Sequence, residues 1–466
     1  MVGSIHHLRH REPAKRIEAC GCHNKFSAIT MRLWPNRKLN RMLIACLLTG
    51  LAQPVSWADD HETSYNVHFS GKFHPEAGYF AAQISVDQPT QRLVLLDFAA
   101  PAKRFSHFTI NSPHHQVIID ATENDGNSPP EADLLRQGNR VIWRIPAAGG
   151  SISYRVKVDH LRDGKFDARM TSEWALLRLD DLFPPARARS LVGARSESTL
   201  KLSGPRSWTI ESRYGPVTGQ MAVDDPDRRF DRPTGWLIAG QLGIRRDTVA
   251  ERKISLAAPR NQGFRRLDTL AFIRWTLPRL VKIFTIFPDR LLIVSALDDM
   301  WRGGLSGPSS LYLHADRPLI SENATSTLLH ELVHVAMAQS PGNAPDWIVE
   351  GLAEYYSLEI LRRSGGISQQ RYQQSFEKLL EWADEDKGKL KSPSTGPDTA
   401  RAAILFHRLN RNLEKNTAGS LDSVVRQLVE ADEQDFATLL HIVDKIDSKS
   451  AAKLDQFVKK YNDDSH

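Results

Sequence analysis

The stretch HELVHVAMAQ, residues 330–339, decides the fold of the second half of the chain. Apolar residues surround its two histidines, as expected for a helix that packs against a core. On a helix, His330 and His334 are one turn apart on the same face, so both imidazoles can bind a single ion. Glu331 lies about 100° further around the helix, where it can reach a water molecule on that ion. The spacing therefore predicts a zinc site with Glu331 beside it as a general base.

A second helical stretch, WIVEGLAEYY (residues 347–356), follows after a short turn. Its carboxylates Glu350 and Glu354 are one turn apart and interrupt an otherwise apolar run. A catalytic zinc takes three protein ligands and keeps one position open, so Glu350 is the predicted third ligand. Glu354 is predicted to accept the outer N–H of a ligating histidine and so to hold its ring in place. The alternative for both residues is a solvated helix face.

HELVH followed by WIVEGLAEYY resembles the gluzincin zinc metallopeptidases, most closely their glycyl aminopeptidase-like and aminopeptidase N branch. The resemblance implies that His330, His334 and Glu350 bind one Zn²⁺ per chain and that Glu331 is catalytic. It implies hydrolysis of a peptide or protein substrate, in which zinc lowers the pKa of its water to about 7. Glu331 would take the proton of this water and deliver it to the leaving amine.

Aminopeptidases of this family carry a Gly-Gly-x-Glu strand before the zinc helix, and its glutamate holds the free amine of the substrate. The matching residues here are Gly303, Gly304, Leu305 and Ser306. The resemblance implies that this strand binds the substrate, and an extended peptide can pair with its edge. Because a serine stands at the glutamate position, the sequence favours an endopeptidase or a different exopeptidase over capture of an amino terminus.

The family also uses a tyrosine to hydrogen-bond the oxyanion, and the matching position here is Thr399. Loss of one such donor typically lowers the rate by about 10² to 10³. His407, Tyr372 and Tyr312 are candidates for a replacement donor, and a purely structural role is the alternative for each.

The chain has 466 residues, enough for two or three domains. From about residue 62 it consists of short alternating runs such as SISYRVKV (151–158), which are typical of half-buried strands. After residue 325 nearly all of it has helical periodicity. We expect an α+β multidomain fold, in which a β-sandwich-like domain (59–245) precedes a thermolysin-like, mainly α-helical zinc peptidase domain (246–466).

Residues 1–58 are predicted to be a presequence with a signal core at about 31–58. A basic segment precedes the apolar stretch MLIACLLTGLA (42–52), and SWA at 56–58 suits signal cleavage before Asp59. The expected location is periplasmic or secreted, and an uncleaved anchor is the alternative. All three cysteines lie in this segment, so no disulfide is expected after cleavage.

The net charge of +6 comes from the presequence, which holds nine Lys/Arg residues and two glutamates. The rest of the chain has 52 basic and 53 acidic residues, so no nucleic-acid partner is expected. A membrane contact is expected only if the signal is retained. The alternative to a peptidase is a peptidase-like binding or scaffold protein that keeps zinc but has lost turnover.

Overall fold

The computed structural model describes residues 64–462, apart from 89–92, 94, 112–115, 120–132, 190–193, 224–229, 298, 340–343, 385–389, 391 and 392. The predicted presequence lies outside the described residues. Across the described part of the chain, no helix combines the length and the apolar character needed to cross a membrane.

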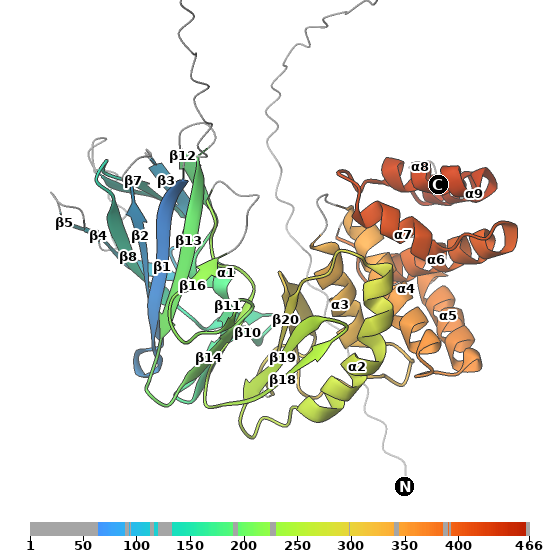
Figure 1. The fold of residues 1–466 in the computed structure, drawn as a ribbon, viewed down its shortest axis with the longest axis horizontal. Coiled ribbons are helices and arrows are strands. Elements are labelled where there is room, and N and C mark those ends of the chain that lie inside the picture. The colour runs from blue at the N-terminus through green and yellow to red at the C-terminus, as the bar shows by residue number, and fades with distance from the viewer. Residues whose placement is uncertain are drawn as a thin grey trace, which may run out of the picture. The chain divides into compact units, whose positions relative to one another are not determined.

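The leading part of the described chain consists mainly of three β-sheets (Figure 1). The seven-stranded sheet has the order β16 (Met221–Val223), β13 (Arg195–Ser203), β1 (Ser64–His74), β2 (Tyr79–Asp87), β8 (Gly150–Lys157), β4 (Phe105–Asn111) and β5 (Gln116–Ile119). The four-stranded sheet has the order β12 (Ala186–Arg189), β3 (Leu95–Ala99), β7 (Arg140–Arg144) and β6 (Leu134–Gln137). The six-stranded sheet has the order β15 (Gly215–Pro216), β14 (Thr209–Ser212), β17 (Trp236–Gly240), β11 (Trp174–Arg178), β10 (Lys165–Met170) and β9 (His160–Arg162). Two single-turn helices, η1 (Pro75–Ala77) and α1 (Leu179–Leu182), interrupt these strands.

These three sheets share one apolar core. Along β1, β2 and β8, buried and less buried residues alternate, which gives each strand one face for the core. Phe69 and Tyr154 of the seven-stranded sheet pack in one buried cluster with Trp143 of the four-stranded sheet and Leu237 of the six-stranded sheet. This is the sandwich-like packing that the alternating sequence predicts.

A five-stranded sheet follows, in the order β18 (Leu242–Val249), β19 (Arg252–Pro259), β20 (Arg290–Val294), β22 (Ser310–Leu313) and β21 (Gly304–Gly307). The predicted domain limit at 245/246 falls inside β18. Because Asp60–His466 form one compact unit, contacts do not separate the two predicted domains, and their limits stay a prediction. Among the described strands, β21 is the edge of this sheet and pairs antiparallel with β22 alone.

The remaining elements are helices (Figure 1): α2 (Arg266–Ile283), α3 (Thr327–Met337), α4 (Asp346–Arg363), α5 (Gln369–Asp384), α6 (Pro397–Asn416), α7 (Leu421–Val429), α8 (Phe436–Ile446) and α9 (Ser448–Asn462). The Ser326 hydroxyl accepts the N–H of Leu329 and caps the start of α3. α3 packs against β21, β22 and α4, and α6 packs closely on α4 at Gly351. A Cβ at Gly351 would lie 2.5 Å from the Cβ of Ala402, so this crossing requires glycine.

Candidate metal centre

Helices α3 and α4 bring the three predicted metal ligands together. The Nε2 atoms of His330 and His334 are 3.1 Å apart. Glu350 faces both rings, with its Oε2 3.4 Å from Nε2 of His330 and its Oε1 3.3 Å from Nε2 of His334. One ligand atom from each of the three residues lies within 4.8 Å of the other two. The set of two imidazoles and one carboxylate matches the ligands of a catalytic zinc site.

Glu354 lies one turn after Glu350 on α4, beside the Nδ1 atom of His330. Its Oε2 is 3.3 Å from Nδ1 of His330. The two nitrogens of this ring therefore face two different carboxylates, and Nε2 is the one directed at Glu350 and His334. This is the geometry expected if Glu354 holds the ring of a ligating histidine.

The charge around the two imidazoles suits a cation. Burial alone would lower the pKa of His330, but its contacts with Glu350 and Glu354 and the charge of Glu331 raise it to about 10. Burial would likewise raise the pKa of Glu350, yet the two histidines lower it to about 2. The carboxylates thus draw a proton onto His330, and a divalent cation would satisfy the same charges. The residues present therefore fit a metal ion.

Glu331 lies against the edge strand. The residue is 8% exposed, and β21 passes close to its side chain at Gly304. An added Cβ at Gly304 would lie 2.6 Å from Cγ of Glu331 and 2.7 Å from Cγ2 of Thr327. Only glycine allows this approach of the strand to α3. Because side chains alternate along a strand, Ser306 is on the same face as Gly304, whereas Leu305 packs on the opposite face.

The structure places Tyr312, a predicted oxyanion donor, on the face of β22 that points away from α3. Leu311 and Leu313 point into the helical core, while the Tyr312 ring packs against Trp236 at 5.4 Å on the other side of the sheet. Its hydroxyl donates to the backbone carbonyl of Trp301 at 2.9 Å. The prediction that Tyr312 is an oxyanion donor is therefore wrong.

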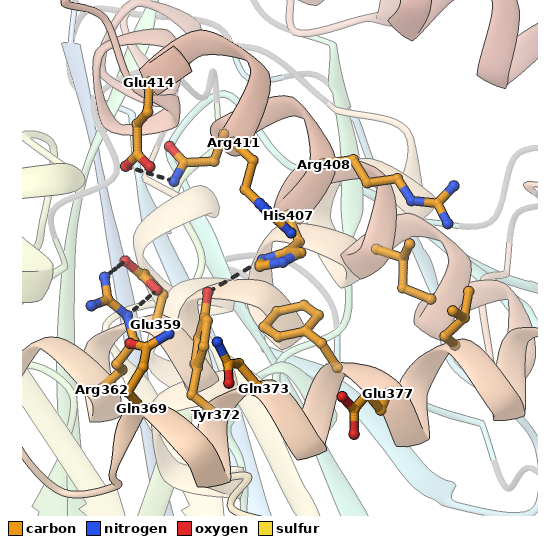
Figure 2. Close-up of a pocket in the computed structure, with 14 residues that line it drawn as sticks. Glu359, Arg362, Gln369, Tyr372, Gln373, Glu377, His407, Arg408, Arg411 and Glu414 are labelled. Atoms are coloured by element: carbon orange, nitrogen blue, oxygen red, sulfur yellow. Dashed lines mark hydrogen bonds and ion pairs between the residues drawn. The ribbon is translucent and has the colours of Figure 1, made fainter.

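His407 and Tyr372 lie in a different pocket from the metal ligands. Figure 2 shows the two side chains facing each other, with the Tyr372 hydroxyl 3.3 Å from Nδ1 of His407. Residues of α4, α5 and α6 line this pocket of about 730 Å³, and none of the metal ligands is among them. Two α4 residues, Glu359 and Arg362, line it. Glu359, the nearer of them to Glu350 in sequence, is nine positions after it, which is about 13.5 Å along the axis and on the opposite side of the helix. The described contacts therefore do not bring His407 or Tyr372 to the candidate metal ligands, and a role as oxyanion donor for either residue stays a prediction.

Thr399, at the position of the family's tyrosine, lies in the first turn of α6. Its hydroxyl is 3.3 Å from the hydroxyl of Ser394, whose backbone N–H donates to Asp346 at the start of α4. Thr399 thus takes part in joining the beginnings of α6 and α4. Its side chain is too short to replace a tyrosine hydroxyl.

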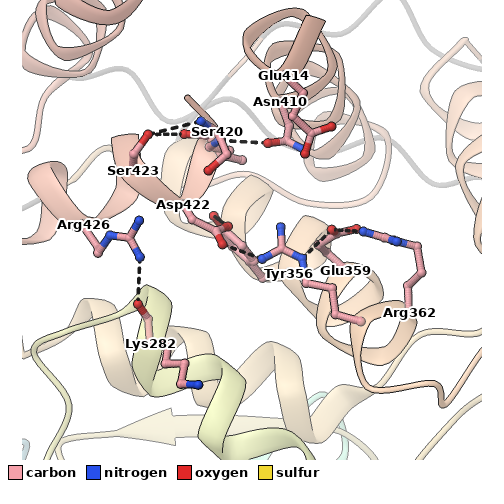
Figure 3. A network of polar contacts seen from close by, with 12 residues as sticks. Lys282, Tyr356, Glu359, Arg362, Asn410, Glu414, Ser420, Asp422, Ser423 and Arg426 are labelled. Atoms are coloured by element: carbon pink, nitrogen blue, oxygen red, sulfur yellow. Dashed lines mark hydrogen bonds and ion pairs between the residues drawn. The ribbon is translucent and has the colours of Figure 1, made fainter. Parts of the chain in front are cut away.

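A network of charges fixes the second half of α4 (Figure 3). Buried Glu359 accepts hydrogen bonds from Arg362 and Arg363, and Arg363 also pairs with Asp422 of α7. The Tyr356 hydroxyl donates to the same Asp422 at 3.0 Å. Because α4 carries Glu350 and Glu354, this network ties the helix of these two carboxylates to α7.

Trp301, which the sequence analysis did not single out as a site residue, lies against the backbone just before β21. Its indole ring covers Gly303, where an added Cβ would lie 1.8 Å from ring atom Cζ3. The signal in the sequence is a large aromatic residue two positions before a glycine pair. That signal does not say on which face of the strand the ring lies.

Comparison with known proteins relates this arrangement to aminopeptidases. Residues 325–420 match the M61 glycyl aminopeptidase family. An aminopeptidase N family protein from Idiomarina loihiensis has a similar structure, with a TM-score of 0.58 and 15% identity over 78% of this chain and 70% of that chain. Legionella pneumophila aminopeptidase A, solved in complex with aspartic acid, has a TM-score of 0.51 and 12% identity over 86% of this chain and 50% of that chain. No curated protein matches the sequence.

At these identities the solved structures are evidence for the fold alone, whereas the family match covers both helices of the metal centre. The findings confirm the predicted resemblance to the glycyl aminopeptidase and aminopeptidase N branch. They also confirm the predicted α+β multidomain fold and the predicted class of enzyme, a peptidase.

Proposed function

We propose, on the premise of the match to the M61 glycyl aminopeptidase family, that the protein is a zinc-dependent peptidase. His330, His334 and Glu350 would hold one Zn²⁺ per chain. The observation that carries the proposal is the convergence of their ligand atoms to within 4.8 Å, directly beside the buried carboxylate of Glu331. A purely structural zinc site has no need of such a carboxylate.

When bound, zinc would supply Lewis acidity to the attacking water and to the substrate carbonyl. Glu331 would accept the proton of the water as it attacks the peptide carbon, and would then deliver that proton to the leaving amine. The close approach of Gly304 to Glu331 supports this role, because β21 is the strand that we propose binds the substrate. Glu354 would keep the His330 ring oriented through the contact with its Nδ1.

The substrate would be an extended peptide that pairs with the open edge of β21. The N–H of His314 donates to the carbonyl of Gly303. In an antiparallel pair of strands, residues whose backbone groups bond the partner strand alternate with residues whose backbone groups point away from it. The N–H and C=O groups of Gly304 and Ser306 therefore point away from β22. No strand among the described residues pairs with that side. Since a serine is the residue that faces the site here, we propose cleavage within a chain in preference to capture of its amino terminus.

The test is to measure metal content and hydrolysis of a quenched-peptide library by the chain from Asp59. We expect one zinc per chain, loss of hydrolysis after chelation and recovery on adding Zn²⁺. The cleavage sites would show whether substrates are cut internally. One zinc without any hydrolysis would contradict a peptidase and favour the scaffold alternative. Hydrolysis that persists in the metal-free protein would contradict the zinc mechanism.

We also propose export, on the evidence of the amino-terminal sequence alone. In a bacterial host, the protein is expected in the periplasmic or secreted fraction with Asp59 as its first residue. Amino-terminal sequencing of that fraction would check this. A protein that keeps residues 31–58 and sediments with membranes would favour the anchor alternative instead.

A further inference from the structure

The loop that leads into β21 is paired with the β-sandwich part of the chain. The N–H of Phe166, in β10, donates to the carbonyl of Asp299 at 2.8 Å, and the N–H of Trp301 donates to the carbonyl of Phe166 at 2.8 Å. Met300, between them, is 1% exposed. Two backbone hydrogen bonds and a buried side chain therefore fix this loop to β10.

Side chains of the β9–β10 hairpin strengthen the attachment. Arg169 forms an ion pair with Asp299 at 3.0 Å. The guanidinium of Arg162 stacks on the Trp301 ring, 4.7 Å from its centre. The same ring also lies against Gly303, so the indole contacts both Arg162 and the backbone that enters β21.

The carbonyl of Trp301 is fixed as well. It accepts the Tyr312 hydroxyl at 2.9 Å and the Gly303 N–H at 3.0 Å. Tyr312, which is not an oxyanion donor, therefore anchors Trp301, two positions before the glycine pair.

The two glycines place β21 between two side chains. Trp301 lies against Gly303, and Glu331 lies against Gly304. Successive residues of a strand face opposite sides, so the ring supports the strand from behind while the carboxylate lies in front of it. We propose that Trp301, held by the β9–β10 hairpin, is a positioning residue that keeps the peptide-binding edge of β21 at its distance from Glu331.

This inference rests on the proposed peptidase function. Without the indole, β21 can move back from Glu331, and the backbone groups of Gly304 and Ser306 no longer hold a substrate in register with that carboxylate. Edge pairing is made by the substrate before reaction, so its loss raises KM more than it lowers kcat. A misplacement of about 1 Å can cost up to about 10²-fold in rate.

The experiment compares Trp301→Ala, Trp301→Phe and Trp208→Ala in the zinc-loaded chain. Trp208 is also half-buried but packs on Phe73 in the β-sandwich, so its removal controls for a general loss of stability. For Trp301→Ala we expect kcat/KM to fall by about 10- to 100-fold, mostly through KM, with zinc content unchanged. Trp301→Phe should restore most of the loss, and Trp208→Ala should leave KM unchanged.

Amide hydrogen exchange over residues 303–313 gives a readout that does not depend on activity. Exchange there should be faster in Trp301→Ala and unchanged in Trp208→Ala. If the wild type hydrolyses no peptide, the proposed function fails, and the exchange data still decide whether Trp301 positions β21. Unchanged exchange and unchanged KM in Trp301→Ala, or equal effects of both alanine variants, would overturn the inference.

Discussion

Replacing Glu331 with glutamine is expected to lower kcat/KM for peptide hydrolysis by about 10²- to 10⁴-fold, the usual contribution of a general acid–base group. Glutamine has nearly the same shape and fits the same space under Gly304, but it cannot accept the proton of the attacking water. The metal should stay, because Glu331 is not among the three groups that converge. Steady-state kinetics together with metal analysis would check both parts.

Glu322→Gln is a matched control for this change. It removes the same charge from the exposed loop just before α3 and should leave kinetics and metal content unaltered. If Glu331→Gln lost zinc, the carboxylate would be a ligand or a structural support instead of a base. If the variant kept full activity, the mechanism assigned to Glu331 would be wrong.

Replacing Glu359 with alanine is expected to lower the free energy of unfolding by about 3 to 5 kcal/mol. The carboxylate is 1% exposed and balances the two guanidinium groups of Arg362 and Arg363. Burial alone would raise the pKa of Glu359, but these arginines lower it below its ordinary value of 4.5. Its stabilisation is therefore complete above pH 4.5 and is lost as the pH falls through the lower pKa of the folded state. Urea unfolding at pH 7 and at lower pH would measure both effects.

Glu377→Ala is the control for Glu359→Ala. Glu377, on α5, lines the pocket that also contains Glu359, Tyr372 and His407, but it is exposed to solvent. We expect it to change the stability by no more than about 0.5 kcal/mol. Equal losses from both variants would mean that the buried ion pairs of Glu359 carry no special stabilisation.

The sequence predicts which residues converge at the candidate metal centre because their geometry is mostly local. The spacing of His330 and His334 within one helix fixes their relation, and only the crossing of α3 with α4 is needed to add Glu350. The sequence says less about which side of an element faces the site. All four residues of β22 are buried, so the burial pattern cannot tell that Tyr312 points away from α3.

The same limit applies to side chains that depend on tertiary packing. His407 and Tyr372 are on helices whose rotation about their axes is set by contacts with α4, and those contacts turn both side chains into a separate pocket. Trp301 depends on backbone pairing with β10, which is distant in sequence. No local pattern encodes that pairing.

β21 is only four residues long and offers two outward-facing sets of backbone groups, at Gly304 and Ser306. An unpaired sheet edge is a template on which strands of other molecules can add, and proteins commonly limit that hazard by keeping edge strands short. An edge of this length can form only a few backbone hydrogen bonds with another strand, so such a pairing is weak. Its brevity therefore limits self-association through the edge that we propose binds peptides.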